Sequence, residues 1–304
     1  MELTITKIQT KADELNDKYA SRIHALNLTG PKQSDYPMLN LFFQEVYDAL
    51  ENGELTENEK LDMRTWFGPS MSTDLTLQGH VCVRPLGYNG DYKIIDKIYR
   101  IEHSQDNVMK KWDAYYHQHP APIAVRNRKD IFKQLLSTMP ANSKILNLAS
   151  GPSRDLFEHL QSSNTPLHIT NVDLDQGAIE FSLELLSQIE HDSEINYVHA
   201  NVLRFRTTEQ YDLIWSAGLF DYFNDDLFVK LLQKYAANLG ENGVFVLGNF
   251  NTRNVSRPYM EFADWKLNHR SEQQLIEMGH AAGYSHARVF AEPTGINLFL
   301  ELKK

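Results

Sequence analysis

The chain has 304 residues and a formal net charge of −10, and 42% of its residues are hydrophobic and 11% aromatic. This length suffices for a catalytic domain with an extension, and the negative charge argues against broad attraction to the phosphates of a nucleic acid. The sequence contains one cysteine, no apolar run approaching a membrane span and no apolar core near its N-terminus, so we expect a cytoplasmic protein without disulfides, a secretory signal or a membrane span.

The first part of the chain has the apolar periodicity of helices. Apolar residues recur at helical spacing over 5–26 and again over 39–50. Thr56 and Glu59 predict a capping box at the start of another helix. The pattern breaks over 84–92, which forms either a tight turn or part of a binding site. A further helix is predicted over 123–138.

Short apolar runs alternate with amphipathic stretches after a loop at 137–143, which favours a parallel sheet with crossover helices. Strands are predicted over 144–148, 167–172, 195–199, 211–216, 243–250, 287–290 and 296–302. Helices are predicted over 154–161, 176–190, 225–239 and 271–282. The predicted organisation is a mainly helical domain, 1–140, and an α/β domain, 141–304, with five parallel strands and an antiparallel edge pair.

Small residues follow the first predicted strand, where the chain turns into a helix. Asn147 lies near the end of this strand, and Ala149, Ser150 and Gly151 lie at the turn. Small side chains let a ligand approach the backbone, and the helix N-terminus offers N–H groups and a positive dipole end. Such turns are common in α/β proteins, so this motif gains meaning only from the motifs that follow.

A carboxylate, Asp173, ends the second predicted strand, 22 residues after Gly151. A carboxylate in this place accepts hydrogen bonds from the two hydroxyls of a ribose. A helix N-cap is the alternative role, for which Asp175 is better placed. Asp173 and its neighbour Leu174 therefore predict nucleoside binding.

Two further strand ends complete the predicted nucleoside site. After the third strand, Asn201 can hydrogen-bond an adenine amino group and Val202 can pack on the ring, although a turn asparagine is the alternative. The fourth strand ends in small residues and continues into an aromatic, acidic loop whose rings suit a cation such as a sulfonium. Phe220 and Tyr222 can instead belong to the core. The residues of this segment are Ser216, Ala217, Gly218, Phe220, Asp221 and Tyr222.

Together these motifs resemble those of class I S-adenosylmethionine (SAM)-dependent methyltransferases. The resemblance implies a Rossmann-like sheet and SAM as the cofactor. The first motif departs from the family pattern of an acid followed by three alternating glycines. Asn147 stands in place of the acid, and Ala149 and Ser153 stand in place of two glycines. The departure concerns the placement of the methionine part of SAM rather than the fold.

Four blocks, at 84–92, 124–128, 146–155 and 216–222, also resemble a narrower bacterial group. It includes enzymes that methylate 3-hydroxy fatty acids to methyl esters for cell–cell signalling. The resemblance implies that the N-terminal part is a lid over the cofactor.

Within that resemblance, Arg126 is suited to bind a carboxylate of SAM or of a substrate, and a surface or structural ion pair is its alternative role. Tyr115 and Tyr116 either line the substrate pocket or belong to an aromatic helical face. No metal site is predicted, because His117 and His119 have no carboxylate nearby at ligand spacing.

Three functions remain open from the sequence. The first is methyl transfer to a small molecule, in which a carboxylate nucleophile needs no base, while a hydroxyl or amine needs one, with Tyr88, Asp221 and Tyr222 as candidates. The second is attack on the aminobutyrate chain of SAM, which releases methylthioadenosine and forms a cyclic amino acid. A polar group must then take the proton of the reacting amine, and Tyr88, Tyr222 and Asn249 are the candidates. The third is SAM binding without catalysis. Nucleic acid is disfavoured as a partner, and no oligomeric state is predicted.

Overall fold

The structure is a computed structural model that describes residues 9–304, so residues 5–8 of the first predicted helical stretch lie outside it. The chain forms two compact units, each built from three segments. The helical unit consists of the described part of Met1–Gly90, Ile101–His119 and Ser256–Lys266. The sheet unit consists of Asp91–Arg100, Pro120–Val255 and Leu267–Lys304. These are not the same sets of residues as the predicted domains 1–140 and 141–304.

The helical unit has short helices because glycines, prolines and polar caps interrupt the chain at close intervals. Its α-helices are α1 (Lys11–Leu15), α2 (Ser21–Thr29), α3 (Tyr36–Glu51), α4 (Glu57–Arg64), α5 (Pro69–Ser72), α6 (Leu77–Val83), α8 (Met109–His117) and α13 (Arg257–Phe262). A π-helical turn covers Asn16–Ala20, and 3₁₀ turns cover Gln33–Asp35 and Thr65–Phe67.

The core of the helical unit is aromatic. Phe43 of α3 lies against Phe67, Tyr115, Tyr259 and Phe262, with ring centroids 4.8 to 6.4 Å apart. Tyr259 and Phe262 come from the third segment of the helical unit, so the core joins residues more than 200 positions apart in sequence. Such ring pairs add to the free energy gained by burying apolar area.

The predicted capping box of α4 is confirmed. The Thr56 hydroxyl accepts a hydrogen bond from the Glu59 N–H at 3.3 Å, and the Glu59 carboxylate accepts from the Thr56 N–H at 2.8 Å. One turn later the ammonium of Lys60, fully buried, pairs with Asp264 at 2.6 Å. The same ammonium pairs with Glu57 at 2.5 Å, and its pair with Asp264 joins the third segment of the helical unit to α4.

The sheet unit contains one sheet of seven strands in the order β3-β2-β1-β4-β5-β7-β6, and the predicted α/β fold is confirmed. The strands from β1 to β5 are parallel, and β7 is antiparallel to both β5 and β6. The strands are β1 (Lys144–Leu148), β2 (His168–Asp173), β3 (Glu194–His199), β4 (Tyr211–Ser216), β5 (Leu239–Phe250), β6 (His286–Ala291) and β7 (Asn297–Lys303).

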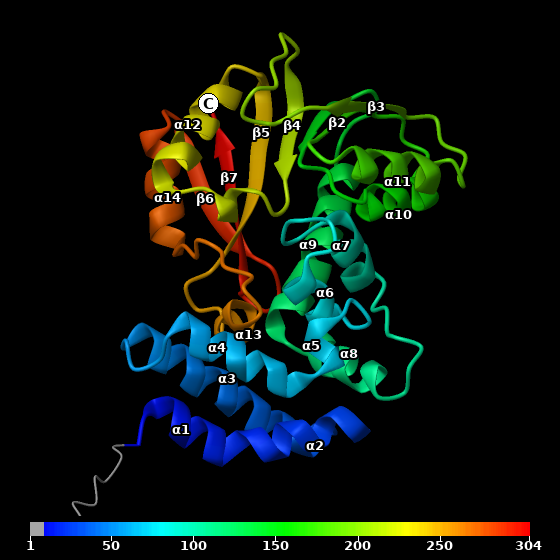
Figure 1. Cartoon of the computed structure of the whole chain (residues 1–304). Helices are drawn as coiled ribbons and strands as arrows, with labels where there is room; N and C mark the ends of the chain where they lie inside the picture. Colours follow the sequence, from blue (N-terminus) through cyan, green and yellow to red (C-terminus); the bar gives the residue numbers. More distant parts are fainter. Residues whose placement is uncertain (1–8) are drawn as a thin grey trace, which may run out of the picture. The chain divides into compact units, whose positions relative to one another are not determined.

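Helices cover both faces of this sheet (Figure 1). The helices are α7 (Tyr92–Tyr99), α9 (Pro120–Ser137), α10 (Arg154–Ser162), α11 (Gln176–Leu186), α12 (Asp225–Ala236) and α14 (Glu272–Ala281). On one face, α9 and α10 pack over a core that includes Phe132, Trp215 and Phe299. On the other, α12 and α14 pack over Phe228 and Phe245. The near-continuous apolar strands follow from this double coverage.

Candidate cofactor site

The strand order places a ligand-binding edge at the carboxyl end of β1. From β1 the chain crosses to β2 and β3 on one side and then returns to β4 on the other. Ligands of open α/β sheets bind where the order reverses in this way, outside the carboxyl ends of the strands. In this sheet that edge holds the residues that follow Leu148, Asp173, His199 and Ser216.

Three alternate residues in the loop after β1 have a left-handed backbone. The φ angles are +55° at Ala149, +58° at Gly151 and +51° at Ser153. These are the positions where the methyltransferase pattern has glycines, so the loop keeps the glycine conformation although two of the three residues have a Cβ. A non-glycine residue there costs roughly 1–2 kcal/mol, which indicates a loop shaped for a ligand rather than for stability.

Hydrogen bonds hold one side of the loop on the protein, and the other side has free space next to the backbone of Gly151. The Ala149 N–H donates to the Val172 carbonyl at 2.8 Å, and the Gly151 carbonyl accepts from the Ser182 hydroxyl at 3.0 Å. A Cβ placed on Gly151 would meet no atom of the described chain within 4 Å. The Ser150 hydroxyl is buried and has no hydrogen-bond partner among the described residues. An open backbone beside an unsatisfied buried hydroxyl fits a polar cofactor.

Replacing Ala149 with glycine is expected to raise the free energy of unfolding by about 1 kcal/mol, because glycine adopts a φ of +55° without strain. Urea denaturation checks this. Alanine-to-glycine substitution at Ala178, buried in α11, serves as the control and should lower stability by about 1 kcal/mol. Equal losses in the two variants would contradict the strain at Ala149.

Asp173 occupies the predicted position at the end of β2. One of its carboxylate oxygens accepts from the Gly151 N–H at 2.8 Å, and the other accepts from the Asp175 N–H at 2.9 Å. Burial raises the pKa of this carboxyl above its usual value, and the backbone hydrogen bonds oppose that shift. Each oxygen keeps a lone pair for a further donor, as two ribose hydroxyls would require. Asp175 takes the N-cap role on α11, where it accepts from the Gly177 N–H.

The residues predicted for the adenine lie at the neighbouring strand ends. Leu174, directly after Asp173, leaves 63% of its surface exposed. Asn201 accepts from the Leu203 N–H at 2.8 Å and so begins a turn. The buried Val202 is held through its carbonyl, which accepts from the Tyr235 hydroxyl at 2.7 Å. An exposed leucine beside these fixed groups would provide an apolar surface for an aromatic base.

The strand interiors next to the loop are polar, and among their buried side-chain atoms the amide nitrogen of Asn171 has no hydrogen-bond partner in the described chain. Asn147 donates from its side-chain amide to Asn171 on β2 at 2.9 Å, and the Ser216 hydroxyl donates to the Leu148 carbonyl at 3.0 Å. Ala217 and Gly218 then leave the sheet at the carboxyl end of β4. A Cβ on Gly218 would overlap Nη1 of Arg128, so a larger residue here would have to displace the guanidinium.

In the loop after β4, Phe220 is fully buried and packs against Phe228 and Phe245, whereas 40% of Tyr222 is exposed. The Asp221 carboxylate is buried and accepts from the Phe250 N–H at 2.6 Å. Asn249 is buried, and its side-chain amide donates to the backbone carbonyls of Phe250 and Asn268 and accepts from Arg270. Of these four predicted site residues, Tyr222 offers the most exposed side chain.

Asp221 is expected to make stability depend on pH. Burial raises the pKa of its carboxyl to about 7, whereas the unfolded chain loses this proton near pH 4. Between these values the unfolded state is the deprotonated one, so rising pH removes up to roughly 4 kcal/mol of stability. Asp221→Asn lacks this loss, and its unfolding free energy relative to wild type should increase by about 2–4 kcal/mol between pH 4 and 8. Urea denaturation across this range checks it; a difference independent of pH would contradict it.

Arg128 was not predicted, although it lies only two residues after Arg126. Buried residues of α9 include Ala121, Val125, Arg128 and Phe132, which share one helical face. Arg126 is half-buried and lies off this line. Helical periodicity therefore contained the signal that Arg128 points inward.

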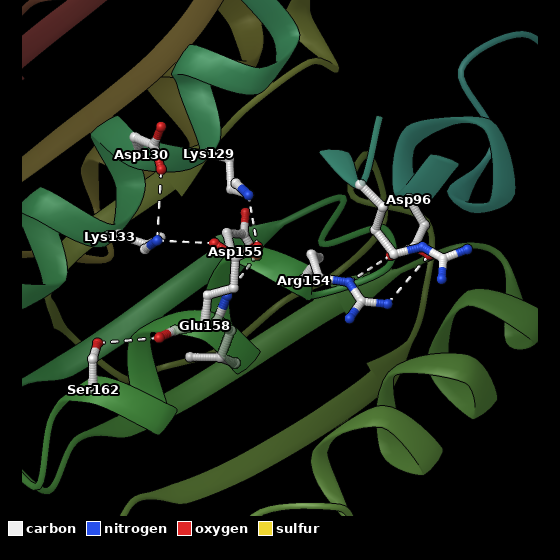
Figure 2. Close-up of polar contacts among 10 residues, drawn as sticks. Asp96, Lys129, Asp130, Lys133, Arg154, Asp155, Glu158 and Ser162 are labelled. Atoms are coloured by element: carbon white, nitrogen blue, oxygen red, sulfur yellow. Dashed lines mark hydrogen bonds and ion pairs between the residues drawn. The ribbon is translucent and has the colours of Figure 1, made fainter. Parts of the chain in front are cut away.

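Ion pairs fix α10, the helix that follows the loop, onto α9 and α7 (Figure 2). Glu158 pairs with Lys129 at 2.6 Å and with Lys133 at 2.8 Å. Arg154, the first residue of α10, pairs with Asp96 of α7 at 2.8 Å. Because α10 begins where the loop ends, these pairs help to hold the loop in place.

The remaining predicted residues belong to the helical unit. Tyr88 is 40% exposed in the segment between α6 and α7. Tyr115 is buried, and its hydroxyl donates to Asn40 at 2.7 Å. Tyr116 is buried and lies against His117 and Tyr259. The aromatic residues of α8 thus form part of a packed core, the alternative stated for them, and a substrate role remains a prediction.

No cluster of three or more His, Cys, Asp or Glu side chains that could hold a metal ion occurs among residues 9–304. No described helix is both long and apolar enough to cross a membrane.

Residues 145–243 match a protein family described as a methyltransferase domain. A possible exported protein from Bordetella parapertussis superimposes with a TM-score of 0.63 and 14% identity, over 100% of this chain and 99% of its own. Magnesium protoporphyrin IX methyltransferase from Synechocystis PCC 6803, with bound S-adenosylhomocysteine (SAH), superimposes with a TM-score of 0.52 and 10% identity. The superposition covers 75% of this chain and 100% of that one. The SAM-dependent methyltransferase SibL superimposes with a TM-score of 0.51 and 10% identity, over 85% of this chain and 77% of its own. No curated protein matches the sequence.

At these identities the structural similarity shows the fold, and that fold is the Rossmann-like fold of class I methyltransferases. The family match over residues 145–243 supports SAM as the cofactor. The predicted class, transferase activity and cofactor therefore agree with these comparisons, whereas the narrower fatty acid group does not follow from them.

Proposed function

We propose that this protein transfers the methyl group of SAM to a small-molecule acceptor. The observation that carries the proposal is the loop from Ala149 to Ser153, which keeps three left-handed residues and leaves the Ser150 hydroxyl unsatisfied. Asp173 would hold the ribose, Asn201 and Val202 the adenine, and this loop the methionine part. When bound, SAM supplies a methyl group activated by its sulfonium charge.

The chain's own contribution is alignment of the acceptor and exclusion of water. Asp221 is buried and already bonded to the Phe250 N–H, which makes it a better orienting group than a mobile base. Tyr222, with 40% of its surface exposed, remains the candidate in the sheet unit for contact with an acceptor. A nucleophile that is already ionised suits such a site, because its attack needs no base.

We propose a carboxylate as that nucleophile, with 3-hydroxy fatty acids as the first acceptors to test. The resemblance of four sequence blocks to enzymes of that type supports this choice. A pocket of about 410 Å³ beside the carboxyl end of β5 fits the apolar part of such an acceptor, and its charged lining residues are Arg253 and Glu272. Its lining includes Ile123, Arg253, Val255, Ile296 and Leu298. An apolar chain with a charged end would match this lining.

The test is incubation of the pure protein with SAM, first alone and then with candidate acceptors, followed by liquid chromatography and mass spectrometry. Methyl transfer predicts unchanged SAM in the first incubation, and SAH with a methyl ester in the second. Methylthioadenosine with a cyclic amino acid would instead establish attack on the aminobutyrate chain, which no specific structural observation favours. The cytoplasmic location and the absence of nucleic acid substrates stay predictions.

A further inference from the structure

Arg128 is a buried cation without a counter-charge. Only 7% of its surface is exposed. Its one hydrogen bond runs from Nε to the Tyr99 hydroxyl at 3.4 Å, the long end of the range, and no described residue forms an ion pair with it. The two terminal nitrogens of the guanidinium therefore have no acceptor among residues 9–304.

The other cations nearby are paired, so this state is particular to Arg128. Lys129 and Lys133 on the same helix share Glu158, at 2.6 and 2.8 Å. Arg270, equally buried in the sheet unit, donates to Asp225 and Asn249 at 2.8 Å each. A buried charge left unpaired costs several kcal/mol, and an anionic ligand that pairs with Arg128 would remove this cost.

Two buried acids that act on Arg128 electrostatically form no ion pair with it. Asp155 and Asp221 act on it through space, but each directs a carboxylate oxygen to a backbone N–H, of Leu156 and Phe250 respectively. Burial raises the pKa of Asp155 to about 6 and that of Asp221 to about 7, so near pH 7 Asp155 is mostly ionised whereas Asp221 is only about half ionised.

The position of the guanidinium connects it with the cofactor edge. Nη1 lies so close to Gly218 that a Cβ there would overlap it. Gly218 follows β4 at its carboxyl end, and β4 is the strand directly beside β1 and its loop. The free side of the guanidinium is thus placed at the edge of the sheet where the ligand binds.

We propose that Arg128, rather than Arg126, binds a ligand carboxylate in the methyltransferase site, and that this is the amino-acid carboxylate of SAM. A carboxylate is the group that matches the planar fork of a guanidinium with two parallel hydrogen bonds. The inference rests on the proposed function insofar as it takes SAM as the ligand. The carboxylate of the acceptor is the other source of the same chemistry, and the experiment separates the two.

The experiment compares two ligands that differ only by a carboxylate. Binding of SAH and of its decarboxylated analogue is measured by calorimetry for wild type and Arg128→Met. Wild type should prefer SAH, and the variant should bind SAH at least about 30-fold more weakly while binding the analogue as before. Retained binding of the analogue also shows that the variant is folded.

Two further variants test the geometry. Arg128→Lys keeps the charge but not the fork and should lose only part of the preference for SAH. Gly218→Ala should reproduce the selective loss, because its Cβ displaces the guanidinium. Lys230→Met, which removes an exposed cation from α12, is the control and should leave both affinities unchanged.

The outcomes decide as follows. If Arg128→Met keeps its affinity for SAH but raises KM for a carboxylic acid acceptor at least about 30-fold, the site binds the acceptor's carboxylate. Equal losses for both nucleosides, or no change in affinity or KM, would overturn the inference. Wild type that binds SAH no better than the analogue, with an unchanged KM in the variant, would overturn it and leave the proposed function standing. Wild type that binds neither nucleoside would refute both.

Discussion

Asp173→Ala is expected to lower the affinity for SAH at least about 100-fold. Each hydrogen bond from a ribose hydroxyl to this carboxylate contributes roughly 1.5–3 kcal/mol, so the loss of two gives a factor of this size. The carboxylate also fastens the loop through the Gly151 N–H, at 2.8 Å, and its removal frees the turn that must contact the cofactor. Isothermal titration calorimetry measures the affinity.

Asp175→Ala provides the matched control for Asp173→Ala. Asp175 lies in the same turn and caps α11 through the Gly177 N–H at 2.8 Å, so its loss should cost about 1 kcal/mol of stability. We expect it to leave SAH binding within a few-fold of wild type. Normal SAH affinity in folded Asp173→Ala would show that the carboxylate is only structural.

Gly151→Ala is expected to separate binding from folding. The left-handed φ of +58° makes the variant roughly 1 kcal/mol less stable. The added methyl group enters space that no described atom occupies, so the free protein has no clash. A cofactor seated on the loop would meet this methyl group, and we expect SAH to bind about 10- to 100-fold more weakly.

Gly53→Ala repeats the same backbone strain away from the loop. Gly53 follows α3, has a φ of +71° and likewise has no atom near its Cβ position. It should lose similar stability and keep its affinity for SAH. Thermal unfolding and calorimetry on both variants make the comparison, and equal SAH affinities would show that the cofactor does not approach Gly151.

The sheet could be predicted because its signal is local. β1 and β4 have the predicted bounds, Lys144–Leu148 and Tyr211–Ser216, since short apolar runs ended by small or polar residues specify buried parallel strands. β5 starts at Leu239, four residues before its predicted start, where a register irregularity against β4 interrupts the apolar pattern. The short helix α13 was not predicted.

The composition of the two units could not be predicted, because it depends on distant contacts. In the helical unit, the Tyr259 hydroxyl of α13 donates to Gln78 at 2.6 Å, across 181 positions of sequence. No local pattern contains that pairing. The site was predicted in part for the same reason: Asp173 ends a recognisable strand, whereas the importance of Arg128 depends on the absence of a counter-charge, which only the folded chain shows.

The third segment of the helical unit has a consequence for the order of folding during synthesis. Phe43 on α3 packs against Phe262, whose codon follows 219 positions later. At about 5–20 residues per second, the ribosome needs roughly 10–40 s to deliver the second ring after the first. The aromatic core of the helical unit is therefore completed only after β5 has been synthesised. A fragment ending at His119 would expose this aromatic surface, and a chaperone that shields it would act on nascent chains still lacking α13.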